Sequence, residues 1–124
     1  MNTDDKQTLI ARQLKDIISQ AGNIVGGNDA NEAIEAFSKY SEELKNYLLE
    51  NSSNEMILER LEQVPYIDFK KLNTTGTSAV LGSSVFGAVD YFRNYNRKKK
   101  IIGDIRTAQG IYSSIEFLYR SEMS

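Results

Sequence analysis

Apolar side chains recur every third or fourth residue through most of this chain, and no segment alternates apolar with polar residues over the length of a strand. An α-helix completes a turn in about 3.6 residues, so this spacing places the apolar side chains on one side of each helix. The pattern predicts an all-α protein. We expect a compact antiparallel bundle of about five helices, formed by a single domain over residues 1–124.

The first helix is expected at residues 4–25, where the signals at both ends agree with the apolar spacing. Thr3 precedes two aspartates and is suited to cap the free backbone amides. Gly26 and Gly27 follow the last apolar residues, and glycine ends helices because it tolerates the left-handed conformation. The expected apolar face consists of Ile10, Leu14, Ile17, Ile18, Ala21, Ile24 and Val25.

Two further helices are expected after pairs of residues that have the spacing of a capping box, which bonds side chains to the free amides of the first turn. These pairs are Asp29 with Glu32 and Ser52 with Glu55. The second helix has an apolar seam and an opposite acidic face, which we expect to be solvated. The seam comprises Ala33, Ile34, Phe37, Tyr40, Ser41, Leu44 and Leu48, and the acidic face comprises Glu32, Glu35, Glu42 and Glu43.

The third helix is expected at residues 53–64, because its short apolar stripe stops at Pro65 and the residue before a proline disfavours helical backbone. That stripe contains Ile57, Leu61 and Val64. The segment 66–72 is compatible with a helical turn or with an extended connection. We expect a short helical turn there.

The stretch of residues 74–96 contains no charged side chain before Asp90 and holds a fourth apolar stripe. This stripe consists of Leu81, Val85, Ala88, Val89 and Phe92, and a fifth consists of Ile101, Ile105, Ala108, Tyr112, Ile115 and Tyr119. The two stripes would lie on nearly opposite sides of one continuous helix. We therefore favour a turn near Asn94 and Asn96, which gives a helical hairpin. One long helix is the alternative, because neither glycine nor proline is present at that turn.

Both of these last segments also carry a row of small side chains. The rows are Ala79, Ser83 and Gly87, and Gly103, Thr107, Gly110 and Ser114. A glycine inside a helix costs about 1 kcal/mol relative to alanine, which suggests a compensating close contact. We expect the two rows to meet.

Residues 72–89 are uncharged and are flanked by Lys70, Lys71 and the basic run 97–100, as a membrane span would be. However, the segment is rich in serine and threonine, and its large apolar residues lie on one side, whereas lipid favours apolar residues all round. We expect a soluble, cytoplasmic protein, also because the first ten residues are acidic and polar, unlike a secretory signal. The alternative is a membrane-associated protein that inserts residues 74–92.

The chain contains no histidine and no cysteine, which removes imidazole and thiolate chemistry. The glycines at positions 82 and 87 have the spacing of a phosphate-binding loop, but Ala88 and Val89 replace its lysine and hydroxyl residue. Carboxylates are numerous, yet none is distinguished from an ordinary helix surface. We expect no enzymatic activity, no catalytic residue, no metal site and no cofactor.

Charge is distributed unevenly along the chain. Residues 1–64 carry six basic and twelve acidic side chains, whereas residues 65–124 carry nine basic and five acidic ones. A basic cluster stands out in the second half, with a tyrosine inside it, and it favours an anionic partner. The candidate binding residues are Arg93, Tyr95, Arg97, Lys98, Lys99, Lys100 and Arg106.

These features favour a non-enzymatic helical protein that binds another protein, in the manner of an inhibitor, an immunity protein or an adaptor. Two alternatives remain. One is the membrane-associated protein described above, and the other is a nucleic-acid-binding module that uses residues 93–106. The sequence pI of about 5.2 is unlike that of a dedicated nucleic-acid-binding protein.

Overall fold

The computed structural model describes the backbone of residues 3–68 and 85–123, and the side chains of residues 6–68 and 96–121. These ranges contain α-helices and no strand, which confirms the predicted all-α class. The helices are α1 (Thr3–Val25), α2 (Asn31–Asn51), α3 (Glu55–Glu62) and α5 (Val85–Met123).

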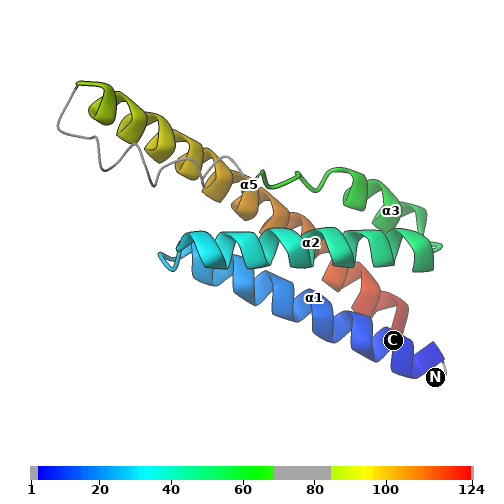
Figure 1. Cartoon of the computed structure of the whole chain (residues 1–124). Helices are drawn as coiled ribbons and strands as arrows, with labels where there is room; N and C mark the ends of the chain where they lie inside the picture. The colour runs from blue at the N-terminus through cyan, green and yellow to red at the C-terminus, as the bar shows by residue number, and fades with distance from the viewer. Residues whose placement is uncertain (1–2, 69–84, 124) are drawn as a thin grey trace.

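The helices form a bundle in which α1 and α2 lie side by side and run in opposite directions (Figure 1). Helix α5 crosses behind them, runs antiparallel to α1 and contacts α1 more extensively than any other pair of helices contact each other. Helix α3 packs against α2 and α5. As a result, the start of α1 and the end of α5 lie at the same end of the bundle (Figure 1).

Apolar side chains from each helix of the described ranges meet in one core. The predicted stripe of α5 is confirmed, because each of its members from Ile101 to Tyr119 is at most 7% exposed. The other buried apolar side chains are Ile10, Leu14, Ile17, Ala21, Ile24, Ile34, Phe37, Leu44, Leu48, Ile57, Leu61, Val64 and Ile67. Burial of apolar surface is the main favourable term in folding, so helical periodicity alone located most of the core.

Helix α1 ends where the two glycines predict. Gly27 has a φ of +126°, a conformation that side chains with a Cβ rarely adopt. The N–H of Gly26 donates to the Gly22 carbonyl at 2.9 Å, and the N–H of Asn28 donates to the Asn23 carbonyl at 2.9 Å. These bonds satisfy carbonyls of the last turn, which otherwise have no partner inside the helix.

The capping prediction for α2 is wrong. Ala30 occupies the N-terminal cap position and makes no side-chain bond to the first turn, so Asp29 does not cap the helix. With φ −59° and ψ 148°, the backbone at Ala30 is extended, and the Ala30 carbonyl accepts the first helical bond from Ile34 at 3.1 Å. The chain therefore enters α2 through backbone geometry alone, one residue later than the predicted box.

The capping prediction for α3 names the wrong residue. Ser52 belongs to the end of α2, because its N–H still donates to the Leu48 carbonyl at 2.9 Å. Asn54 caps α3 instead, and its Oδ1 accepts from Met56 N at 2.8 Å and from Ile57 N at 3.4 Å. Helix α3 is accordingly shorter at both ends than the predicted 53–64.

The segment after α3 is irregular in residues 65–68, so the expected helical turn is wrong there, and residues 69–72 lie outside the described ranges. Ile67 is 2% exposed. Its carbonyl accepts from Ser38 Oγ at 2.9 Å, which joins the irregular segment to α2. This buried bond gives the Ile67 carbonyl the hydrogen-bond partner that it would have had inside a helical turn.

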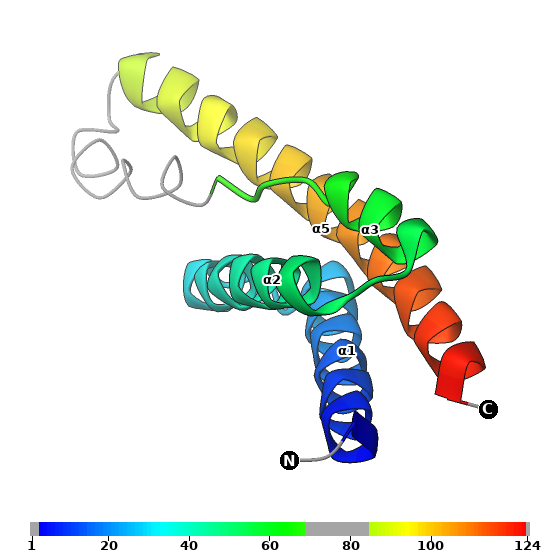
Figure 2. The same cartoon turned by 90° about the vertical axis from the view of Figure 1, so that its right-hand side faces the viewer.

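Helix α5 is continuous through Asn94 and Asn96, so the favoured turn is wrong and the long-helix alternative is right. Helical hydrogen bonds are local, and no glycine or proline interrupts residues 88–102. In both views the first turns of α5 project beyond the ends of α1 and α2 (Figures 1 and 2). A helix that runs past the end of its bundle does not need to keep one apolar phase over its whole length.

Continuity of α5 also rules out the predicted contact of Gly87 with the second small row. Gly87 and Gly110 lie in the same helix, about 35 Å apart at about 1.5 Å per residue. A Cβ added at Gly103 or Gly110 would meet no other atom within 4 Å. The two glycines of the second row therefore face open space, whereas the hydroxyl of Ser114 in the same row is buried. Ala79 and Ser83 of the first row lie outside the described residues.

Candidate functional site

The basic cluster lies where α5 leaves the bundle. Residues 96–100 contain no buried side chain, and Ile101, the next residue, is the first buried member of the α5 stripe. Lys98 is half-buried, whereas Arg97, Lys99, Lys100 and Arg106 are exposed. Arg93 and Tyr95 belong to α5, but their side chains lie outside the described ranges.

The cations of the cluster surround α5 and do not form a flat patch on one side of it. Successive residues of an α-helix are rotated by about 100°, so the run of cations at 97–100 encircles α5. A single partner surface can therefore contact only part of it. Lys99 and Arg106, seven residues apart, lie on the same side, opposite the buried stripe.

That outer side continues along the helix as a defined face. Its residues are spaced by four and three, and all are exposed: Lys99, Gly103, Arg106, Gly110, Ser113 and Phe117. We call this set the outer face of α5. Phe117 is 63% exposed, more than the other exposed large apolar side chains of the described residues. The outer face thus combines two cations, two glycines with open space above them and one exposed aromatic ring.

Within the described residues, no ion pair involves the cations of the outer face. Lys39 pairs with Glu35 at 3.2 Å on α2, and Arg120 pairs with Glu116 at 2.9 Å on α5. Asp104 is the carboxylate nearest in sequence to Arg106 and is half-buried. The described part of α5 therefore carries a positive surface potential that an anionic partner would relieve.

The acidic face of α2 is solvated, as expected: Glu32 and Glu43 are exposed, and Glu35 and Glu42 are half-buried. The first 64 residues hold the excess of acid, and the cluster on α5 holds the excess of base. The molecule therefore presents surfaces of opposite sign on different helices.

The buried polar pair of Tyr112 and Ser41 is structural. Tyr112 is fully buried and donates its hydroxyl proton to the Ser41 carbonyl at 3.2 Å, while Ser41 Oγ lies 2.8 Å from the same hydroxyl. Burial raises the pKa of Tyr112 to about 12, the Ser41 contact opposes that rise, and the charge of Glu42 adds to it. A phenol held neutral inside the bundle links α2 to α5 and is not poised to transfer protons.

Sequence reasoning located the cations but missed Phe117 as a surface residue. A signal was present, because Phe117 lies two positions after Ile115 and therefore on a different side of the helix from the buried stripe. The second row of small residues was noticed but assigned to packing. Two of them, Gly103 and Gly110, belong to the exposed outer face, which could be recognised only when α5 was seen to be one continuous helix.

The described residues contain no group of three or more acidic side chains arranged to hold a metal ion. Helices long and apolar enough to cross a bilayer are likewise absent from the described part of the chain, which leaves out residues 74–84 of the alternative insertion segment. No family model, curated protein or solved structure matches this chain.

Proposed function

We propose that this chain is a non-enzymatic helical protein that binds another protein, as an inhibitor, an immunity protein or an adaptor does, through the outer face of α5. One observation carries the proposal. On that single face, Lys99 and Arg106 alternate with two open glycines, and the face ends on Phe117, which is 63% exposed.

The composition of the outer face favours a protein partner over a bare phosphate backbone. Cations alone attract any polyanion, but an exposed aromatic ring is the kind of anchor that contributes most of the energy in protein interfaces. The glycines at 103 and 110 let a partner backbone approach α5 closely. Lys99 and Phe117 lie about 27 Å apart along the axis at about 1.5 Å per residue, which a partner helix of about five turns would span.

The partner is therefore a protein with acidic side chains at one end of its contact surface and an apolar recess at the other. The charge contrast would accelerate encounter, and Phe117 would slow dissociation. Binding to nucleic acid through residues 93–106, or to a membrane through residues 74–92, would depend on different side chains. These two alternatives make distinct predictions in the same experiment.

The test is affinity capture from extracts of the native cell, treated with nuclease, using the parent protein and two charge-reversed forms. Lys99→Glu with Arg106→Glu changes the outer face, and Arg12→Glu with Lys15→Glu makes the same change of charge on exposed residues of α1. We expect the first pair to lose a partner protein that the parent and the control retain. With the purified partner, the lost affinity should appear mainly as slower association that depends less on salt.

Three results would contradict the proposal. Equal loss in the control would mean that only net charge matters. Capture that nuclease abolishes would indicate nucleic acid. Recovery of the parent only with membranes, unaffected by reversal at Lys99 and Arg106, would indicate insertion of residues 74–92.

A further inference from the structure

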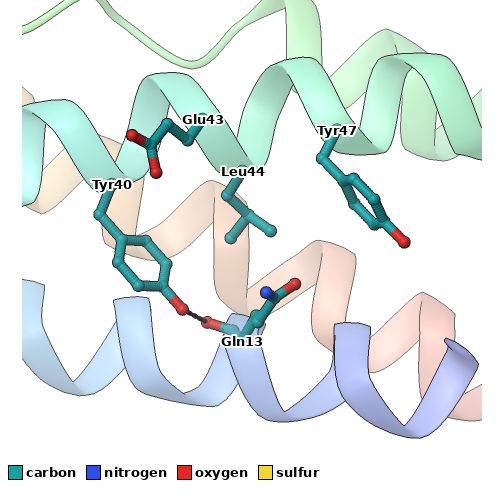
Figure 3. Close-up of a pocket in the computed structure, with 5 residues that line it drawn as sticks. All are labelled: Gln13, Tyr40, Glu43, Leu44 and Tyr47. Carbon is teal, nitrogen blue, oxygen red and sulfur yellow. Dashed lines mark hydrogen bonds between the residues drawn. The ribbon is translucent and has the colours of Figure 1, made fainter. Parts of the chain in front are cut away.

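A small groove lies between α1 and α2, on surfaces that the outer face of α5 does not include. It has a volume of about 210 Å³ and is lined by Gln13 of α1 and by Tyr40, Glu43, Leu44 and Tyr47 of α2 (Figure 3). We call it the seam groove. Sites for drug-sized ligands usually measure about 300–1,000 Å³, so the seam groove is suited to one side chain rather than to a cofactor.

The lining of the seam groove offers aromatic faces and hydrogen-bond acceptors. Figure 3 shows the Gln13 amide below Leu44 and between the two tyrosines, with Glu43 beside Tyr40. Within the described residues, Gln13 Oε1 is buried and has no hydrogen-bond partner. Leaving such an oxygen unpaired costs free energy, but its neighbours cover it, so the groups that a guest meets are the tyrosines and the Glu43 carboxylate.

Within the described part of the chain, the one charged residue that lines the seam groove is acidic. Glu43 contributes an exposed carboxylate, and none of the lining residues is a cation. Burial raises the pKa of Tyr40, and the nearby charge of Asp16 raises it further, so a second carboxylate acts on the same end of the groove. The Tyr40 hydroxyl donates to the backbone carbonyl of Gln13 at 3.4 Å. The face of the Tyr40 ring then lies along the groove wall.

Two cations near this seam have partners outside the groove. Lys6 Nζ donates to Asn51 Oδ1 at 2.6 Å, and Lys45 Nζ donates to the Val64 carbonyl at 3.5 Å. In the described structure neither lysine lines the groove. A cation supplied from outside would therefore meet acidic and aromatic groups without displacing one of these two.

We propose that the seam groove binds one arginine or lysine side chain from a basic segment of a partner protein. The alkyl stem lies against Leu44 and the tyrosine rings, and the cation faces Glu43 and the rings. Cations are attracted to the faces of tyrosine rings as well as to carboxylates. The seam groove prefers a cation, whereas the outer face of α5 prefers an anionic partner. The two proposals rest on different residues, so each can be tested without the other.

The test is a nuclear magnetic resonance titration of the ¹⁵N-labelled whole chain with N-acetyl-arginine N-methylamide, and with the citrulline analogue as a neutral probe of nearly the same shape. The arginine probe should shift the backbone amides of Gln13, Tyr40, Leu44 and Tyr47 saturably, with a dissociation constant on the order of 1 mM for so small a ligand. The citrulline probe should bind at least about threefold more weakly.

Substitutions in α2 separate the groove from bulk charge. Glu43→Gln should weaken arginine binding by about two- to fivefold, and Glu43→Lys should abolish it, because the new cation occupies the rim. Glu50→Gln removes an exposed carboxylate seven residues further along the same side of α2, outside the groove, and should change nothing. Glu43 and Glu50 are both solvent-exposed, so folding of these variants should be preserved, which thermal melting can check.

The proposal is overturned if citrulline binds as tightly as arginine, if Glu50→Gln weakens binding as much as Glu43→Gln, or if the groove amides do not shift. It is also overturned in favour of a second copy of this chain if the same amides shift with protein concentration alone. In that case Lys99→Glu should remove the concentration dependence, because the basic cluster of one copy would fill the groove of another.

Discussion

The two sides of helix α5 between residues 99 and 119 share one backbone and one helical register, yet they differ in almost every physical property. The inner side carries six apolar residues that are at most 7% exposed, and five of them are large. The outer face carries cations, glycines and an exposed Phe117. The inner side explains why the bundle folds, and the outer face contributes little to folding. Residues that contribute little to folding and are chemically distinctive are the ones from which function should be inferred.

The largest predicted contrast comes from deleting an apolar side chain on each side. Ile105 is fully buried, so Ile105→Ala should lower the free energy of unfolding by about 2–5 kcal/mol through lost burial and the cavity left behind. Phe117→Ala removes a larger side chain but should change the free energy of unfolding by about 0.5 kcal/mol or less, because Phe117 is exposed. Chemical denaturation of both variants measures this. Similar losses would mean that Phe117 is covered and that the two sides are not distinct.

A second prediction concerns the polar bond on the inner side. Tyr112→Phe removes the hydroxyl that bonds to the Ser41 carbonyl and hydroxyl, and leaves those groups buried without it. The free energy of unfolding should fall by about 1–3 kcal/mol. The double variant with Ser41→Ala should cost less than the sum of the single changes, because each removes the same interaction. Strict additivity would contradict the coupling of α2 to α5 through this pair.

The same tyrosine predicts a loss of stability at high pH. Because burial raises the pKa of Tyr112 to about 12 in the folded protein, above about 10 in the unfolded chain, folding favours the protonated phenol. Its stabilising contribution is complete below about pH 10 and is lost as the pH rises towards about 12. Unfolding measured from pH 9 to 12 should show the parent losing stability relative to Tyr112→Phe. If the difference in stability between the parent and Tyr112→Phe stays constant across this range, the pKa of Tyr112 is not raised by folding.

The smallest predicted effect lies on the outer face and has the opposite sign. Gly103→Ala and Gly110→Ala should each raise the free energy of unfolding by about 0.5–1 kcal/mol, because alanine favours the helix and its Cβ meets no other atom within 4 Å. Gly27→Ala is the matched control and should be destabilising, since Gly27 has a φ of +126°. A destabilised Gly110→Ala would mean that an element outside the described residues packs there.

These comparisons also show what the sequence could and could not predict. The apolar stripes of α1 and α2 and the α5 stripe from Ile101 to Tyr119 were predicted correctly, because burial imposes a local period on the residues of each helix. The side chains of the predicted stripe from Leu81 to Phe92 lie outside the described ranges. The cap of α3 was not, because Ser52 and Asn54 are both suitable residues and the choice depends on where α2 ends. The turn at Asn94 was predicted on the assumption that both apolar stripes of α5 face one core, which fails when the helix extends past the bundle.

The candidate sites divide in the same way. A run of cations is visible in any sequence, so the basic cluster could be named as a candidate from the sequence alone. Its alignment with Phe117 depends on an unbroken register through α5. The seam groove joins Gln13 to residues 40–47 of another helix, and no local pattern connects positions so far apart. Contacts between helices require the packing itself, which periodicity does not encode.

The proposed role of the outer face of α5 in binding, and not in folding, is tested most directly by Gly110→Leu. Leucine favours the helix, and its first side-chain carbon meets open space at this position, so the melting temperature should stay the same or rise. Its bulk should nevertheless keep a partner backbone away, and affinity capture should lose the protein that the parent retains. A variant that melts like the parent and captures the same partner equally well would contradict the claim.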